Sequence, residues 1–580
     1  MRRETADLVI IGAGIYGVET AKTYLQVHPD QKVVLLDGGE SMGGTWSRER
    51  VYPSLHANNT LGWLEFPDMP MTPEEFDVKP GEHIKGAAVR DYLVAYAKRF
   101  QVFDKIRLRT KVDSVERAEE GGWLVSWTVS SAGASDKVGT IHAKRLVVAT
   151  GHTCEALLPR FKGQASFQKP LFHTKDWSLH YDLLTTAHEA LVLGAGKSAY
   201  DAAYMFADAG IKTHMVVRAS GHGPAWMCKY EATPLKLGLE GLAMRRVIGL
   251  LSPCMWGHDG EYGFVRRFLH GTWLGRKITK AFWGIVHNDV VQLSGIMDHP
   301  GSRKLLPWTD FFWSGTSCSI LNHDKDFYQF VRDGLVEVHV ADIEELGTDS
   351  VRLSTGETLK VDAMVCSTTW KDRPSINFLP SGSEAKLGLP HFSPDPDPEG
   401  HFARADRKVL ETFPLLHDQP VINRHLTSIP TAENEPFDPT TENMPYLLYR
   451  FMVPPAYLRD RSLVFLGVPL TFNQGQMAPT QALWATAYFD GHVEVPEEKA
   501  AMEETILHAR HARWRAPAGY GAKFPDWIFD TMPCIDMMYK DIGVFGWRKT
   551  GWKDLFAPYM PADFRGVVGE YVRKYREADK

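Results

Sequence analysis

The chain has 580 residues, of which 44% are hydrophobic and 23% charged, with a formal net charge of −6. This length exceeds what one hydrophobic core usually serves, so two or more domains are expected. The charge balance gives no electrostatic reason to expect nucleic acid or an anionic membrane as a partner. The six cysteines have no C-x-x-C spacing. We therefore expect no metal site and no dithiol motif, but reduced thiols in a reducing, cytoplasmic compartment.

Membrane segments are not evident. The arginines at the start precede a short apolar run, as in a signal peptide, but this run is better explained as the first strand of a nucleotide-binding unit. No run of about 18 apolar residues occurs, so no spanning helix is expected. The segment from Val247 to Met255 could touch a membrane surface, although a buried helix is the preferred interpretation.

The clearest motif lies near the N-terminus, where a short apolar run enters a turn with the spacing G-x-G-x-x-G. Gly12 permits the tight turn, Gly14 lets the backbone approach a pyrophosphate, and Gly17 lets the following helix pack closely on the strand. A second apolar run, residues 32–36, ends at Asp37, about twenty residues beyond the last glycine. A carboxylate at this place accepts hydrogen bonds from ribose hydroxyls. The pattern therefore predicts a dinucleotide site with an unphosphorylated ribose, as in FAD.

A second point of close backbone approach follows at Gly43 and Gly44, and Thr45 and Trp46 come next. Residues 51–71 are rich in proline, asparagine and aromatic side chains, and we expect an ordered loop that carries function.

The opening pattern recurs at residues 190–206, as a strand, a glycine turn and a helix. The turn reads G-x-G-x-x-A at Gly194, Gly196 and Ala199, and alanine is accepted at the third position. Two such units indicate two bound nucleotides; the alternative is one functional unit and one decayed copy.

The residue that discriminates between nucleotides follows the next strand, residues 212–217. Arg218 stands there in place of an acid. A guanidinium pairs with a 2′-phosphate, which a carboxylate would repel. We therefore predict NADP(H) at the second unit; a solvated surface arginine is the alternative. Lys197 and Ser198 lie within the turn, and Lys197 faces either a phosphate or solvent.

Two long stretches lack clear periodicity. Residues 221–322 form an insertion with many tryptophans, expected either to help wall a substrate cavity or simply to pack as helices. Residues 375–446 are rich in proline, aspartate and glycine and read as extended loop.

The motifs together resemble the flavin-containing monooxygenases, including the Baeyer–Villiger branch and the larger fungal members. The resemblance rests on the first glycine turn, GAGIYG, on GGTW, on VVATG at 147–151 and on the second glycine turn, GAGKSA. It also rests on the pattern D-x-x-V-x-x-T-x-W from Asp362 to Trp370, where the chain returns to the sheet. The family's linker fingerprint is present in stretched form. Phe161, Gly163, His173 and Trp177 match in type, but more residues separate Gly163 from His173 than in the family pattern. Alternatively, Phe167, His173 and Trp177 match in spacing, with Lys169 in place of the glycine.

The resemblance implies an α/β fold with two Rossmann-type domains, the NADP domain inserted into a discontinuous FAD domain. The implied boundaries are residues 1–184 for the first part of the FAD domain, 185–370 for the NADP domain with its insertion, and 371–580 for the rest.

The resemblance also implies the chemistry, which is oxygen insertion into a small organic substrate with NADPH and O2 through a C4a-(hydro)peroxyflavin. Both N/S-oxygenation and the Baeyer–Villiger reaction stay open. An NADPH oxidase or dehydrogenase, or a non-enzymatic NADP sensor, is the alternative. A flavin disulfide reductase is disfavoured because no dithiol is spaced for it.

Site residues follow from the same resemblance. Asn58, with Asn59 adjacent, matches a catalytic asparagine near the peroxide or the NADP+ ribose; a turn-forming pair is the alternative. Val112 matches a backbone contact to the flavin's adenine, and Gln481 and Trp484 lie in the helix that closes the FAD site. His173 is read as a hinge contact between domains more than as a base.

Overall fold

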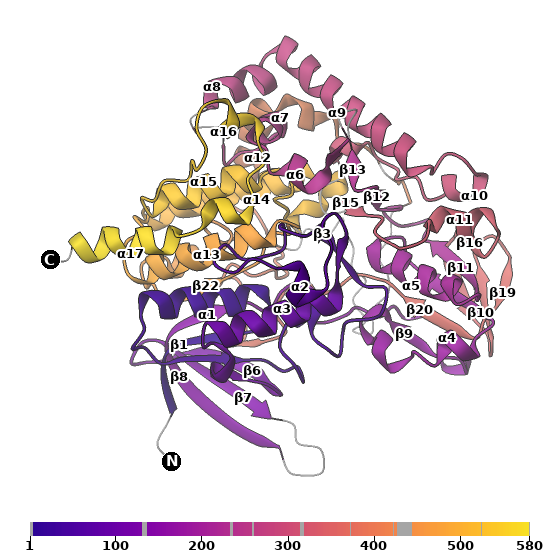
Figure 1. Ribbon diagram of the computed structural model, residues 1–580, viewed down its shortest axis with the longest axis horizontal. Coiled ribbons are helices and arrows are strands. Elements are labelled where there is room, and N and C mark those ends of the chain that lie inside the picture. The colour runs from indigo at the N-terminus through magenta and orange to yellow at the C-terminus, as the bar shows by residue number, and fades with distance from the viewer. Residues whose placement is uncertain are drawn as a thin grey trace.

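The computed structural model describes residues 4–129, 136–232, 236–257, 260, 262–313, 318–371, 373–421, 423–425, 444–523 and 525–578. Two separate sheets dominate these residues, one near the N-terminus and one formed by the middle of the chain (Figure 1). Helices from the insertion and from the C-terminal part lie beyond them.

The first sheet has eight strands in the order β21-β6-β7-β8-β1-β2-β5, with β22 also paired to β8. Its strands come from three separate stretches of the chain, so this domain is discontinuous. The strands are β1 (Glu4–Ile11), β2 (Val33–Leu36), β5 (Ile106–Arg107), β6 (Thr110–Arg117), β7 (Trp123–Val129), β8 (Lys137–Val148), β21 (Asn377–Leu379) and β22 (Leu463–Phe465).

The centre of this sheet is parallel, since β1 pairs in parallel with both β2 and β8. Continuous apolar runs suit strands that are covered on both faces. Helix α1 (Ile15–Val27) packs against α13 (Gln474–Phe489), which is buried from residue 475 to its end. A helix apolar on all sides belongs in a core. Helix α3 (Gly86–Arg99) packs beside α1.

The second sheet has five parallel strands in the order β16-β11-β10-β20-β9. The strands are β9 (Leu171–His173), β10 (Glu189–Leu193), β11 (Lys212–Val217), β16 (Val336–Val340) and β20 (Ala363–Cys366). Helices α5 (Lys197–Asp208) and α11 (Phe327–Arg332) pack against it, and the small sheet β17 (Ile343–Leu346), β18 (Ser350–Leu353) and β19 (Thr358–Lys360) follows β16. The expected pair of Rossmann-type sheets, one interrupting the other, is confirmed.

The strands also bear on the domain boundaries. β9 pairs with β20 in the second sheet, although it precedes residue 184, while β21 returns to the first sheet at Asn377. We propose that the first crossing lies between β8 and β9, earlier than the sequence led us to expect.

The insertion contains short strands and several helices. They are β12 (Trp226–Cys228), β13 (Glu231–Ala232), β14 (Leu237–Gly238), α6 (Leu239–Ala243), α7 (Arg246–Leu251), α8 (Gly263–Arg266), the π-helical turn η5 (Arg267–Gly271), α9 (Trp273–Ser294), α10 (Pro300–Arg303) and β15 (Cys318–Ile320). Ile248 and Leu250 of α7 are buried, so this segment packs inside the protein.

The C-terminal part is helical, and the reading of residues 375–446 as extended loop was wrong over α12 (His401–Thr412). Residues 426–443 of that stretch lie outside the described part. The other helices there are α14 (Glu498–Arg515), α15 (Thr531–Asp541), α16 (Trp552–Phe556) and α17 (Val567–Ala578). None of the helices in the described ranges combines the length and the apolarity needed to cross a bilayer.

Candidate active site

The first glycine turn is closed so tightly that side chains are excluded. Gly12 has φ +108°, and a Cβ added to it would lie 2.4 Å from the carbonyl oxygen of Ala149. A Cβ on Gly17 would lie 1.9 Å from the Gly12 carbonyl oxygen. Both contacts are with backbone, which cannot move aside, so both positions require glycine.

Beyond this turn, α1 begins after Gly14 without a side-chain cap. Its first N–H groups are therefore available to an anion. Gly14 faces Gly44, and a Cβ on Gly14 would lie 3.8 Å from the Gly44 Cα. The Gly43 N–H donates to the Ala13 carbonyl (2.9 Å), which fixes this second loop against the turn. Two backbones without side chains thus approach each other beside the free N–H groups of α1, which are the groups that could hold a pyrophosphate.

Asp37 lies at the end of β2, beside the same turn. Its carboxylate accepts backbone N–H groups from Ala13 and Gly39, both at 2.7 Å. Burial raises the pKa of Asp37 above its ordinary value. The two hydrogen bonds hold the carboxylate in place, and each oxygen keeps a further lone pair for a ribose hydroxyl.

The other predicted flavin contacts lie on neighbouring elements. Thr45 is exposed and its Oγ1 lies 2.8 Å from Oγ1 of Thr153, while Trp46 is half-buried against the hydrophobic core around the first sheet. Val112 is a buried residue of β6. Gln481 of α13 is fully buried, and its Oε1 accepts from the Gly467 N–H (3.0 Å).

The amide nitrogen of Gln481, Nε2, is the one polar side-chain atom of these predicted flavin contacts that is buried without a partner in the described residues. No group in the described part of the chain accepts a hydrogen bond from Nε2, although the atom is buried. Buried polar atoms are rarely left unsatisfied. An acceptor supplied by a bound flavin would satisfy it, so this residue fits the cofactor.

The second turn repeats the design with more space. Gly194 has φ +128°, and a Cβ there would lie 2.4 Å from the Ser367 carbonyl oxygen. A Cβ on Gly196 would meet no atom within 4 Å, and α5 begins after Gly196 without a side-chain cap. Ala199, in place of the third glycine, is fully buried, and Ser198 beside it is half-buried. The open space at Gly196 fits a second phosphate-bearing ligand.

Arg218 directly follows β11 and is half-buried. Among the described residues, nothing accepts a hydrogen bond from its guanidinium, and Asp342 acts on it only through space. Burial lowers the pKa of Arg218, and burial together with this arginine lowers the pKa of His222 to about 4. A neutral histidine therefore stands beside a cation whose donors remain available for an anionic group.

Lys197 does not point to solvent. Its Nζ donates to Asp201 and to Oδ1 of Asn322 (2.6 Å). The fully buried Asp201 also accepts from the Tyr52 hydroxyl (2.7 Å) and lies 2.7 Å from Nε2 of His323. Burial opposes ionisation of Asp201, but the Lys197 ammonium and the hydrogen bond with His323 outweigh it and lower the pKa of Asp201 to about 2. This network joins the second turn to the segment after Trp46.

Asn58 lies at the far side of that network. It belongs to a short strand, β3 (His56–Thr60), which pairs with β4 (His83–Lys85), where we had expected a loop. Asn322 donates to the carbonyl of the neighbouring Ala57 (2.8 Å), and Ser319 donates to Oδ1 of Asn58 (3.1 Å). The second turn and Asn58 are thus connected through Lys197 and Asn322.

Glu240 of α6 anchors the same strand from the insertion. Its buried carboxylate accepts from Nδ2 of Asn59 (3.0 Å) and from both the N–H and the hydroxyl of Thr60. Burial raises the pKa of Glu240 to about 7. A carboxyl group with this pKa changes charge near neutral pH.

His173 ends β9 and is buried. Its Nδ1 accepts from the Lys175 N–H (3.1 Å), so Nε2 carries the proton and faces the Thr368 carbonyl at 3.3 Å. The ring also contacts Trp370 edge-on, and burial lowers the pKa of His173. Both ring nitrogens are engaged where β9 meets β20. This arrangement fits a structural contact between strands better than a general base.

Sequence reasoning missed Asp201 and Glu240. Asp201 lies four residues after Lys197 on α5, and this i, i+4 spacing is a signal that a pairing search could have used. Glu240 offers no such signal, since Asn59 and Thr60 are about 180 residues away in a segment without a motif.

The insertion also lines a cavity, of about 1450 Å³, with α12, α14 and α15. Its walls include Arg246, Trp256, Arg450 and His508, and none of its lining residues belongs to a glycine turn or to β3. A much smaller cavity, of about 10 Å³, adjoins Asn58, Glu240 and Phe472.

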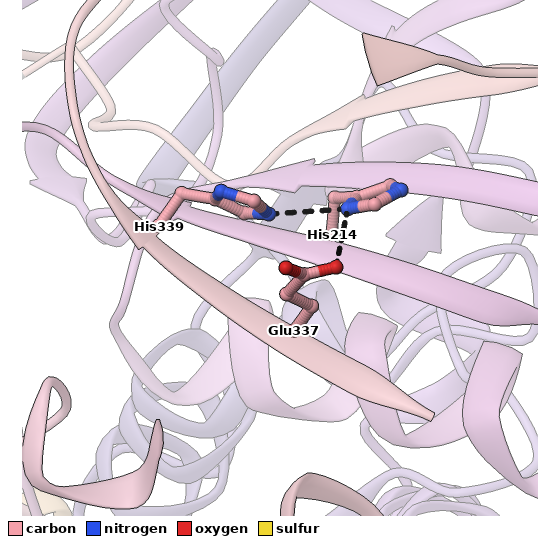
Figure 2. A group of neighbouring side chains, drawn as sticks. All are labelled: His214, Glu337 and His339. Carbon is pink, nitrogen blue, oxygen red and sulfur yellow. Dashed lines mark hydrogen bonds and ion pairs between the residues drawn. The ribbon is translucent and has the colours of Figure 1, made fainter. Parts of the chain in front are cut away.

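Figure 2 shows a cluster of metal-binding residue types on β11 and β16, formed by His214, Glu337 and His339. His214 Nδ1 lies 3.1 Å from His339 Nε2, a hydrogen bond in which one nitrogen carries a proton. Glu337 lies 3.7 Å from both His214 and the Lys212 ammonium. Neither the glycine turns nor β3 contribute a side chain to this cluster, so we do not assign it to the site.

Comparison with known proteins decides the family. A model described as pyridine nucleotide-disulphide oxidoreductase matches residues 9–233. The FAD-dependent monooxygenase resA of Aspergillus sclerotiorum is 33% identical over 600 residues, covering 99% of both chains. The chain belongs to the FAD-dependent monooxygenases. The expected resemblance and the flavoprotein enzyme class are confirmed.

Solved structures agree with this monooxygenase in fold. Cyclohexanone monooxygenase from Rhodococcus sp. Phi1, bound to NADP+, aligns over 99% of this chain and 98% of its own, with TM-score 0.55 and 16% identity. S-allyl-L-cysteine S-oxygenase from Allium sativum aligns over 100% and 94%, with TM-score 0.51 and 15% identity. At these identities the likeness shows the shared two-sheet fold alone.

The disulphide chemistry in the family model's description needs a pair of thiols. Cys228 and Cys318 do meet, in hydrogen-bonding contact on β12 and β15, which spacing in sequence could not reveal. Burial and the neighbouring thiol raise the pKa of Cys228 well above its ordinary value. A thiol held protonated is a poor nucleophile, so the pair does not resemble a reactive dithiol.

Proposed function

We propose that this monooxygenase uses NADPH and O2 to insert one oxygen atom into a small organic molecule, with FAD at the first turn and NADP(H) at the second. One observation carries the proposal: two uncapped glycine turns of the same design are followed by opposite charges, Asp37 after the first and Arg218 after the second. Bound FAD would supply the centre that activates O2, and bound NADPH would supply the reducing hydride.

Arg218 selects the phosphorylated dinucleotide. Its guanidinium offers donors that no described residue uses, on the carboxyl edge of the sheet where such ligands bind. A 2′-phosphate would accept charge-assisted hydrogen bonds there. The open space above Gly196 leaves room for the pyrophosphate.

Asn58 donates hydrogen bonds to the reacting region. Ser319 occupies Oδ1, so the amide is oriented with Nδ2 left to donate. An amide donates without a titratable proton, so it stabilises negative charge on oxygen without protonating it. Glu240 and Asn322 hold the strand on either side of this residue. We assign His173 to positioning at the junction of β9 and β20.

Product analysis tests the proposal. The purified enzyme with NADPH and O2 is offered a cyclic ketone and a thioether, and ester, sulfoxide, NADPH consumption and H2O2 are measured. Ester or sulfoxide in proportion to NADPH supports oxygen insertion and distinguishes Baeyer–Villiger from S-oxygenation. NADPH consumption matched by H2O2 for a broad panel of substrates would point to an oxidase instead.

The six cysteines include no disulfide, and a cytoplasmic location remains our proposal. The partners we propose are the small-molecule substrate and O2, with no nucleic acid.

A further inference from the structure

Helix α9 of the insertion is apolar on two opposite sides. Trp283, Val286 and Val290 are buried in the core beneath it. Leu274, Ile278 and Ile285 lie on its outer side and are exposed. Large apolar side chains that are exposed together on one side of a helix mark a surface for a partner. The outer side of α9 is such a surface.

The preceding turn extends this outer side. Helix α8 and the turn η5 run directly into α9, and α8 and α9 lie along the upper side of the molecule (Figure 1). Their exposed large apolar side chains, each between 42% and 68% exposed, form what we call the apolar edge: Phe264, Phe268, Trp273, Leu274, Ile278 and Ile285. Exposed apolar groups in such number mark an interaction surface.

The charge of this segment is opposite to that of the whole chain. From Tyr262 to Asn288 the sequence has no aspartate or glutamate, but has the basic residues Arg266, Arg267, Arg276, Lys277 and Lys280, in a chain of net charge −6. Arg267 and Lys277 are exposed, and within the described ranges neither has a hydrogen-bond or ion-pair partner. A partner of complementary charge is anionic.

We propose that the apolar edge docks onto the surface of an anionic lipid bilayer. Tryptophan, phenylalanine and leucine on a helix lying in the membrane interface bury their apolar groups at the level of the acyl chains. Arginine and lysine extend along that surface to lipid phosphates. The segment from Val247 to Met255, for which the sequence favoured a buried helix over membrane contact, is largely buried and takes no part in this edge.

This docking is independent of the oxygenation chemistry. It requires no spanning helix, and the lipid would contact only α8, η5 and α9. A second copy of the chain is the competing occupant, because an apolar edge can also pair with itself.

Vesicle flotation of the full-length flavoprotein tests the proposal. We expect flotation with phosphatidylcholine vesicles that contain about one third phosphatidylserine, and weaker flotation with phosphatidylcholine alone or at high salt. The double variant Leu274→Ser/Ile278→Ser should lower binding at least about tenfold, because two apolar anchors are lost. Arg267→Glu/Lys277→Glu should lower it by a similar factor on the anionic vesicles only.

Leu179→Ser is the matched control, because Leu179 is also exposed but lies in the second domain. It should bind vesicles as the parent does. Thermal unfolding of each variant checks that the fold is kept. Absence of flotation of the parent, or equal flotation of parent and Leu274→Ser/Ile278→Ser, would overturn the proposal. So would sedimentation showing a dimer that this variant dissociates while its vesicle binding is unchanged.

Discussion

The two glycine turns have the same backbone design but different surroundings. At the first, Gly14 faces Gly44 and Asp37 is held by two backbone hydrogen bonds. At the second, Gly196 faces open space and Arg218 keeps its donors available. The closed turn suits a ligand that stays bound, and the open one suits a ligand that is exchanged. In the proposed function, the identity of the nucleotide depends on one residue after the next strand.

Breaking the first turn should have the largest effect. In Gly12→Ala the new Cβ would overlap the Ala149 carbonyl oxygen at 2.4 Å, at a φ that alanine rarely adopts. We expect loss of bound flavin and a decrease of at least about 2 kcal/mol in the free energy of unfolding. The flavin-to-protein ratio and urea unfolding measure both.

The control for this variant is Gly196→Ala, which has room for its Cβ. It should keep its flavin and its stability, while the KM for NADPH rises. Equal flavin loss in both variants would contradict the difference between the turns.

Glu240 should make the stability of the protein depend on pH, because its carboxyl group holds β3, the strand that carries Asn58 and is linked to the second turn. Burial raises its pKa in the folded protein to about 7, from an ordinary value of 4.5, so its protonated form favours folding. This contribution is complete below about pH 4.5 and is lost as pH rises through about 7. The loss amounts to about 3 kcal/mol.

Glu240→Gln removes this titration. The free energy of unfolding of the parent minus that of the variant should therefore fall by about 2–3 kcal/mol between pH 5 and pH 8. Urea unfolding at several pH values measures it. A difference that stays constant with pH would show that Glu240 does not titrate in this range.

Replacing Asn58 should cost less free energy than the changes above, but it should specifically alter the ratio of oxygenated product to H2O2. Asn58→Ala removes a donor worth about 1–2 kcal/mol, so oxygenated product should fall about five- to thirtyfold while H2O2 rises. Ser319→Ala, which removes only the hydrogen bond that orients Asn58, should shift the same ratio less. A variant that loses NADPH oxidation and product together, with no added H2O2, would argue against this role.

The two Rossmann units could be predicted from the sequence because each is a local pattern of strand, turn and helix with a diagnostic residue at a fixed distance. The contacts between them could not. Glu240 reaches Thr60 across 180 residues, and Lys197 reaches Asn322 across 125. Neither partner lies in a motif.

Helix α12 was missed for a different reason. Prolines, glycines and aspartates on both sides of it dominated the composition of residues 375–446 and concealed one amphipathic segment, of which Phe402, Ala405 and Val409 are buried. Similarly, Asn58 was expected in a loop because its pairing partner, β4, cannot be recognised from three residues.

The most direct measurement is anaerobic reduction of the bound flavin by NADPH and by NADH, in the parent and in Arg218→Ala. The account predicts that the preference for NADPH falls at least about tenfold, through slower or weaker reaction with NADPH, while NADH is used as before. Arg352→Ala, an exposed arginine on β18 of the same domain, should keep the parent's preference. An unchanged preference in Arg218→Ala would contradict the assignment of the second turn to a phosphorylated nucleotide.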